Sequence, residues 1–162
     1  MVFSVACGIF LQSQPFEEVI VPEPHPDLHR LDVLVGRWSW SGHARDGDFD
    51  VTGWAEYRWL EGSYFLVERS ALTARGETNH SLAITGYDDA RKACVARYFD
   101  SAGLHDQFRL AVDGDRLLVD WDRYRLAADI APDGNRIAGE WQSSDDGRAW
   151  TYWYDMVMQR LT

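Results

Sequence analysis

Residues 105–147 read HDQFRLAVDGDRLLVDWDRYRLAADIAPDGNRIAGEWQSSDDG, and their pattern is the main evidence for the fold. Its short runs of alternating apolar and polar residues are separated by Asp-Gly pairs or by the Asp122-Arg123 break. Glycine beside Asp supplies the positive φ of a tight hairpin turn, so the pattern predicts consecutive antiparallel strands. Similar turns, such as Glu61-Gly62 and Arg75-Gly76, recur roughly every 10 to 15 residues in the preceding part of the chain.

The turns divide the chain after Gly36 into a series of predicted strands. Their ranges are 37–44, 50–60, 63–72, 79–87, 93–101, 105–112, 116–121, 124–131, 136–143 and 148–160. An open sheet of this length would expose two edges, whereas closure removes both. Gly53, Gly86 and Gly139 fall inside strands and suit the bends that closure demands. We therefore expect an all-β fold, a single antiparallel up-and-down barrel of about ten strands.

The residues before the strands fall into two parts. Residues 1–26 contain four of the chain's five prolines and are expected to form an extended N-terminal arm. Leu28, Leu31 and Leu34 share a helical face, and Gly36 follows them, so residues 27–35 are predicted to be a short helix that caps the barrel. The expected domains are the arm, 1–26, and the barrel, 27–162.

Composition excludes several classes of function. The chain has 16 Lys and Arg against 26 Asp and Glu, a net charge of −10, so nucleic acid is not an expected partner. Cys7 and Cys94 form no metal-binding pattern, and Cys94 is interpreted as a small buried hydrophobe. His25 and His29 are four residues apart, but without further ligands they do not make a metal site. No metal and no cofactor are predicted.

The first dozen residues, MVFSVACGIFLQ, are apolar. A secretory signal would carry a basic region, but no Lys or Arg precedes Arg30, and the stretch is shorter than the ~20 residues that span a bilayer. A misassigned start codon and an apolar tail remain alternative explanations. No membrane partner is expected, and the predicted location is cytoplasmic.

The opening of the first strand carries a resemblance to a known fold. Gly36-Arg37-Trp38 follows a short helical segment, and Arg160 lies near the end of the last strand. This arrangement resembles lipocalins and their relatives, the calycins, in which a terminal Arg lies over the Trp of a G-x-W opening. The resemblance implies a cation–π contact between Trp38 and Arg160 that closes one end of a barrel.

A longer set of motifs is similar to one bacterial family. The motifs are Leu31-Asp32-Val33-Leu34-Val35-Gly36-Arg37-Trp38, Trp59-Leu60-Glu61-Gly62-Ser63-Tyr64, Gly86-Tyr87-Asp88, Asp100-Ser101 and the terminal Arg. Together they resemble an uncharacterised bacterial family of lipocalin-like domains of unknown function. That likeness implies a fold and little chemistry.

Nitrobindin, a haem-binding barrel, and the fatty-acid-binding proteins are more distantly similar in shape. The iron ligand of nitrobindin is a His late in the chain, whereas this sequence has no His after His105. We therefore expect no haem.

The candidate ligand-binding residues come from strand alternation, because barrel strands send every second side chain inward. A single bulge would reverse the faces of the residues that follow it. The Tyr hydroxyls and His80 are expected to donate the hydrogen bonds that orient a ligand. The predicted set is Trp40, Tyr57, Trp59, His80, Leu82, Phe108, Trp121, Trp141, Tyr152 and Tyr154.

Three functions remain open. The first is binding of a small hydrophobic molecule, aromatic or polycyclic, inside the barrel. The second is an enzyme with cyclase- or isomerase-like acid/base chemistry in the same pocket, and the third is a barrel filled by its own aromatic residues. The acids of the strands, Glu68, Asp100, Asp120 and Asp155, are expected to face solvent. Catalytic residues stay unassigned, and the sequence leaves both a monomer and a homodimer open.

Overall fold

The computed structural model describes residues 23–44 and 47–162, so most of the predicted N-terminal arm lies outside the described residues. Two short helical pieces come first, α1 (Pro26–His29) and the 3₁₀ helix η1 (Arg30–Leu34). Ten strands follow: β1 (Gly36–His43), β2 (Asp50–Trp59), β3 (Leu66–Ala74), β4 (Glu77–Asp88), β5 (Ala93–Asp100), β6 (His105–Asp113), β7 (Arg116–Trp121), β8 (Tyr124–Ile130), β9 (Arg136–Ser143) and β10 (Thr151–Arg160).

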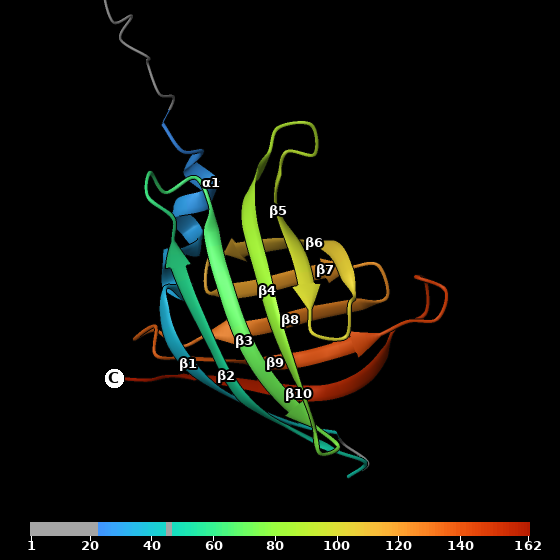
Figure 1. The fold of residues 1–162 in the computed structure, drawn as a ribbon. Helices are drawn as coiled ribbons and strands as arrows, with labels where there is room; N and C mark the ends of the chain where they lie inside the picture. The colour runs from blue at the N-terminus through green and yellow to red at the C-terminus, as the bar shows by residue number, and fades with distance from the viewer. Residues whose placement is uncertain (1–22, 45–46) are drawn as a thin grey trace, which may run out of the picture.

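The strands form a closed antiparallel barrel in which each strand pairs with its neighbours in the chain. Pairing of β1 with β10, in which Trp40 lies opposite Met158, closes the barrel. In Figure 1, β6 to β9 run behind β3 and β4 at a steep angle to them, so the barrel has two differently oriented halves. The predicted all-β up-and-down barrel with a short N-terminal helix is confirmed.

Two strands begin later than the sequence predicts. Strand β3 starts at Leu66 instead of residue 63, because Ser63 adopts a φ of 59° within the preceding turn. Strand β10 starts at Thr151 instead of residue 148. There the backbone N–H groups of Arg148 and Ala149 donate to Asp146 Oδ1, which holds these residues in the turn.

Two glycines allow the close strand approaches that tight closure requires. A Cβ at Gly53 would lie 2.0 Å from the carbonyl oxygen of Ala71 on β3. A Cβ at Gly139 would lie 2.1 Å from the carbonyl oxygen of Ala127 on β8. No side chain fits at such distances, so both positions are restricted to glycine by packing.

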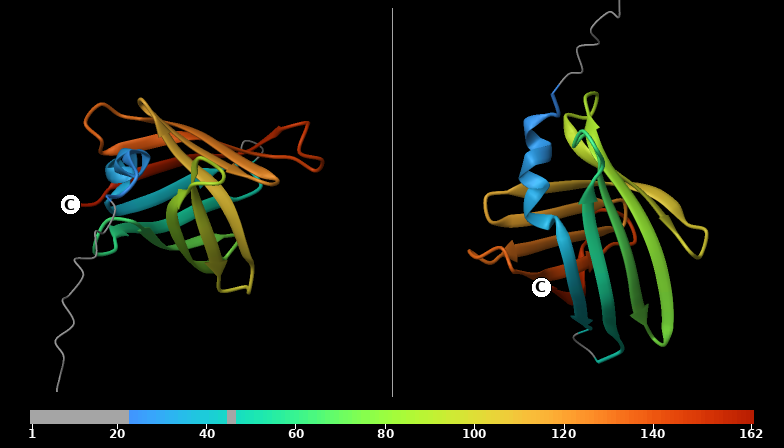
Figure 2. Two further views of the ribbon diagram at one scale, coloured as in Figure 1. Left: turned by 90° about the horizontal axis from the view of Figure 1, so that it is seen from above. Right: turned by 60° about the vertical axis from the view of Figure 1, so that its left-hand side comes forward.

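The helical segment closes one end of the barrel. It lies beside the end of the barrel in Figure 2, and its Leu28, Leu31 and Leu34 are buried. Trp38 is 0% exposed and donates from Nε1 to Leu34 O at 2.8 Å. No helix among the described residues is long and apolar enough to cross a membrane.

Arg160 completes this closed end. Its guanidinium carbon lies 4.3 Å from the centroid of the Trp38 ring. The same guanidinium donates to the carbonyl oxygens of Val35 at 2.5 Å and Val33 at 2.7 Å. The predicted stack is confirmed, and its hydrogen bonds tie the last strand to the end of η1. Elsewhere in the core Cys94 is buried and free, as interpreted.

Candidate functional site

A cavity of about 300 Å³ lies inside the barrel. Leu34 of η1 contributes to its lining from the closed end, and Leu104 lines it from the turn between β5 and β6. A second, more open pocket shares Tyr98, Trp153 and Tyr154 with it. That outer pocket includes Phe49, which precedes the end of β2 that lies away from η1, and we call this end of the barrel the mouth. The cavity volume is at the lower end of the range for small-molecule sites, ~300–1,000 Å³.

The half of the barrel formed by β6 to β10 gives the cavity an aromatic wall. We use this name for Phe108, Trp121, Tyr124, Trp141, Trp153 and Tyr154. The rings follow one another closely: Phe108 and Trp121 have centroids 5.2 Å apart, and Tyr124 and Trp153 are 4.8 Å apart. Trp153 and Tyr154 are 4.9 Å apart. Contiguous rings of this kind offer an extended surface on which a planar ligand can stack.

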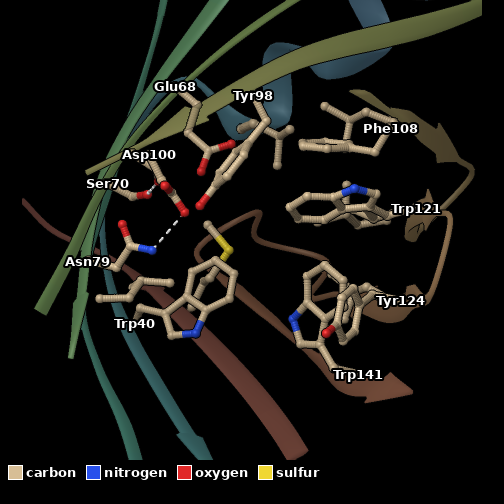
Figure 3. Close-up of a pocket in the computed structure, with 18 of the residues that line it drawn as sticks. Trp40, Glu68, Ser70, Asn79, Tyr98, Asp100, Phe108, Trp121, Tyr124 and Trp141 are labelled. Atoms are coloured by element: carbon tan, nitrogen blue, oxygen red, sulfur yellow. Dashed lines mark hydrogen bonds between the residues drawn. The ribbon is translucent and has the colours of Figure 1, made fainter. Parts of the chain in front are cut away.

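The other half, formed by β2 to β5, gives a polar wall of Tyr57, Glu68, Ser70, Asn79, Ser81 and Asp100. Strand register brings these residues together. Tyr57 lies opposite Glu68, and Ser81 lies opposite both Ser70 and Asp100. Figure 3 shows Glu68, Ser70, Asn79 and Asp100 facing Phe108, Trp121, Tyr124 and Trp141 across the cavity. The cavity therefore has one polar and one aromatic side.

Tyr98 of β5 connects the two walls. Its ring centroid is 5.0 Å from that of Trp121. Burial raises the pKa of its phenol, and a hydrogen bond with Ser81 opposes that shift. Its hydroxyl therefore belongs to the polar wall, whereas its ring extends the aromatic wall.

Asp100 organises the turn between β5 and β6. Its Oδ1 accepts from the backbone N–H groups of Ala102 and Leu104, both at 2.9 Å, and its Oδ2 accepts from Asn79 Nδ2 at 2.9 Å. Partial burial raises the pKa of this carboxyl, but the hydrogen bonds from Asn79 and the turn outweigh burial and leave the pKa below its ordinary value. Asp100 is therefore a charged group near the mouth at neutral pH.

Glu68 lies deeper in the polar wall and has a different state. Burial raises its pKa to about 7, although hydrogen bonds with Tyr57 and Ser70 act to lower it. The Tyr57 pKa is also raised, first by burial and then by the neighbouring Glu68. Among the described residues, no Lys, Arg or His lines the cavity. Glu68 thus has hydrogen-bonding partners and no cationic partner in the cavity.

Two indole nitrogens of the cavity lining are buried without an acceptor. Among the described residues, the Nε1 atoms of Trp40 and Trp141 are the buried side-chain donors for which no hydrogen-bond partner is present. By contrast, Trp121 Nε1 donates to Asp106 Oδ2 at 2.6 Å. A buried donor without an acceptor costs free energy, so such groups occur where a ligand or an ordered water supplies the acceptor.

The structure brings six of the ten predicted residues together in the cavity lining. These are Trp40, Tyr57, Phe108, Trp121, Trp141 and Tyr154. Trp59, His80, Leu82 and Tyr152 are outside it. Whether any of the ten binds a ligand stays a prediction.

His80 and Leu82 were placed on the wrong face of β4. Both are exposed, whereas their neighbours Asn79 and Ser81 line the cavity. The predicted inward face of β4 was the one that carries the large apolar residue Leu82. Here the inward face is part of the polar wall, so the alternation is reversed.

Trp59 and Tyr152 lie outside the cavity lining for different reasons. Trp59 lies at the closed end, where its Nε1 donates to Asp32 Oδ1 of η1 at 2.8 Å. Tyr152 precedes a register shift between Tyr152 and Tyr154, after which Tyr154 lies opposite Trp141. This bulge brings Trp153 and Tyr154 together into the lining and leaves the Tyr152 hydroxyl donating to His43 O at 3.0 Å.

Glu68 and Asp100 were predicted to face solvent, and both line the cavity. The sequence carried a signal for Glu68, because Leu66, Ser70 and Leu72 share its alternation on β3 and face the interior. Asp120 and Asp155 are exposed, as expected. Among the described residues, no group of three or more His, Cys, Asp or Glu is arranged to hold a metal ion.

No family model and no curated protein matches the chain. Among solved structures it is similar to Rv2717c from M. tuberculosis, with a TM-score of 0.60 and 16% identity, over 86% of this chain and 100% of that one. A de novo designed fluorescence-activating β-barrel has a TM-score of 0.45 and 13% identity, over 80% of this chain and 95% of that one. At 16% identity, the similarity to Rv2717c shows that this chain has the barrel fold and says nothing about a ligand of this chain.

Proposed function

We propose that the barrel binds a small hydrophobic, ring-bearing molecule in the cavity between the polar and aromatic walls. The observation that carries this proposal is the cavity itself, about 300 Å³ in volume and bordered by contiguous aromatic rings. A barrel filled by its own side chains would have a much smaller space. Apolar pockets with a few convergent polar groups are the usual form of small-molecule sites.

The polar groups support an oriented ligand. The Trp40 and Trp141 indoles are buried donors without acceptors, so a ligand oxygen or ring nitrogen near them would satisfy one or both. The opposite wall offers the Ser70 and Ser81 hydroxyls, whose oxygens lie 2.6 Å apart. The ring system would lie against the aromatic wall, where stacking adds about 0.5–1.5 kcal/mol beyond the burial of apolar area.

A neutral fluorescent probe tests the proposal. N-phenyl-1-naphthylamine should bind with increased emission, and Trp121→Ala should weaken binding by roughly tenfold through loss of a stacking partner. Trp54→Ala is the matched control, because Trp54 is on β2 outside the cavity lining and 36% exposed. Absence of probe binding, or equal weakening by both variants, would contradict the proposal.

An enzyme acting on such a molecule is the second candidate. It is favoured by Glu68, a buried carboxyl whose pKa of about 7 lets it both accept and donate a proton near neutral pH. Cyclase- or isomerase-like chemistry would use Glu68 to move a proton, with Tyr57 hydrogen-bonded to it. Native mass spectrometry of protein purified from its own host distinguishes the two functions. A binding protein retains one ligand of unchanged mass during incubation, whereas an enzyme converts the ligand to a product of different identity.

The motifs between Leu31 and Arg160 support a relation to lipocalin-like domains. The observed stack of Arg160 on Trp38 is the contact that this relation implies. On that view the pocket is a variant of an interior ligand site, with Glu68 and the aromatic wall setting what it accepts.

A further inference from the structure

The charges of the cavity all have one sign. Glu68 and Asp100 are its two ionisable carboxyl groups, and among the described residues no basic side chain lines it. Asp100 already receives hydrogen bonds on both carboxylate oxygens. Glu68 receives them from Tyr57 and Ser70, which stabilise its charged form but do not neutralise it. The described side chains of the lining therefore supply no positive charge to balance these two carboxyl groups.

The arginines of the strands around Glu68, Arg58 on β2, Arg69 on β3 and Arg97 on β5, are outside the cavity lining. Across β2 it faces Tyr57, and across β4 it faces Ala83, with Ser81 nearby on the same strand. Beyond β4, on β5, Tyr98 lies opposite Ala83 and Asp100 lies opposite Ser81. The titratable groups near Glu68 are therefore two phenols and one carboxylate. A carboxylate in such a place is charged only at a cost in desolvation, unless a bound molecule brings the opposite charge.

The facing wall is suited to the same kind of ligand. An organic cation is attracted to the faces of aromatic rings, most strongly to Trp, and the attraction increases when water is excluded. Trp121 and Tyr124, with centroids 6.0 Å apart, lie across the cavity from Glu68. Asp100 adds a fixed negative charge near the mouth, and the net charge of −10 favours the approach of cations.

We infer that the cavity selects an organic cation, a protonated amine attached to a hydrophobic ring system, with its ammonium group at Glu68 and its rings against the aromatic wall. This inference rests on the proposed function and names its ligand class. A fatty acid or other carboxylate is excluded by the same geometry, because it would bring a further negative charge to a cavity that already has two. A neutral ring-bearing molecule would fill the space but leave Glu68 without its counter-charge.

Three naphthalene derivatives of similar size test the inference by isothermal titration calorimetry. The cation is 1-naphthylmethylamine, the neutral analogue is 1-naphthylmethanol, and the anion is 1-naphthoate. Near pH 8 the wild-type protein should bind the amine at least about tenfold more tightly than the alcohol, and the naphthoate more weakly than both. In Glu68→Gln the amine should lose this advantage and bind within about twofold of the alcohol, while alcohol binding is retained.

The pH dependence of wild-type binding and a control variant test the inference without relying on Glu68→Gln alone. With a Glu68 pKa of about 7, amine affinity of the wild type should fall roughly tenfold between about pH 8 and pH 6, because only the ionised carboxylate pairs with the ammonium. Alcohol affinity should stay nearly constant over this range. Glu56→Gln is the matched control, since Glu56 of β2 is outside the cavity lining and pairs with Arg58 at 2.7 Å. It should leave the preference for the amine unchanged.

The outcomes separate this inference from the proposed function. Tighter binding of the alcohol or naphthoate, or an amine preference that survives Glu68→Gln, would overturn the choice of a cation and leave a binding barrel standing. Failure of all three compounds and of the neutral fluorescent probe to bind would overturn the proposed function, and the inference with it. An amine preference that depends on Glu68 and on pH would support both.

Discussion

At the scale of single residues, Glu68 is the group whose state depends most on its surroundings. Its pKa is raised from 4.5 to about 7, so the folded protein holds a proton that the unfolded chain releases between these values. A raised carboxyl pKa favours the folded state at pH below 4.5 and disfavours it increasingly as pH rises towards 7. A residue that lowers stability at neutral pH and lines a cavity is more easily explained by ligand binding than by folding.

Glu68→Gln should therefore stabilise the free protein in a pH-dependent manner. Near pH 5 the variant and the wild type should have similar free energies of unfolding, and near pH 8 the variant should be more stable by about 1–3 kcal/mol. The amide keeps the shape and the hydrogen bonding but carries no charge to desolvate. Urea unfolding at several pH values measures the difference. A gain that is constant with pH, or that shrinks as pH rises, would show that the carboxyl does not titrate as described.

At the scale of strands, the sequence correctly predicted that ten strands exist and in which order they come, but it did not always predict which face of a strand points into the barrel. Turn chemistry locates all ten strands, because turns that contain Gly and Asp-containing breaks such as Asp122-Arg123 are local signals. The inward face depends on what the strand meets across the barrel. On β7 the apolar face lines the cavity, but on β4 the polar face does, with Ser81 inward and Leu82 outward. The bulge before Tyr154 is likewise invisible in the alternation of β10.

The pairing of β8 with β9 gives a prediction at this scale. In Gly139→Ala the new Cβ would meet the Ala127 carbonyl oxygen at 2.1 Å and Ala128 Cα at 2.4 Å, so the backbones must separate. We expect a loss of several kcal/mol in the free energy of unfolding, as overpacked sites show losses of ~1–3 kcal/mol or more.

Gly76→Ala is the control for Gly139→Ala. Gly76 has a φ of +82°, and a Cβ added there would meet no other atom within 4 Å, so only left-handed strain opposes the alanine and the expected cost is about 1 kcal/mol. Thermal unfolding of both variants checks the difference. Equal losses would mean that strand approach at Gly139 is not what restricts the position.

At the scale of the whole molecule, the two ends of the barrel differ: the residues that stabilise the fold lie at the closed end, and the proposed ligand enters at the mouth. The closed end holds Trp38, Leu31 and Leu34, each no more than 1% exposed, and the contacts of Arg160. At the mouth, apolar side chains are more exposed, Leu104 to 50% and Trp153 to 37%. The motifs at the closed end were recognisable in sequence, because they are local and contain Gly, Trp and Arg at fixed places. The cavity walls were only partly recognisable in sequence, because strand register assembles them from nine strands, β2 to β10.

Two Trp→Ala substitutions test this division. Trp38→Ala removes a fully buried ring, its hydrogen bond to Leu34 O and the surface on which Arg160 stacks, and should lower the free energy of unfolding by about 3–5 kcal/mol. Trp121→Ala removes a ring that lines the cavity and is only partly buried, so its cost should be less than half as large, while it weakens probe binding. Urea unfolding and probe titration of both variants give the comparison. If Trp121→Ala destabilised the fold as much as Trp38→Ala, the aromatic wall would be part of the core that holds the barrel together, and the separation of the two ends would be wrong.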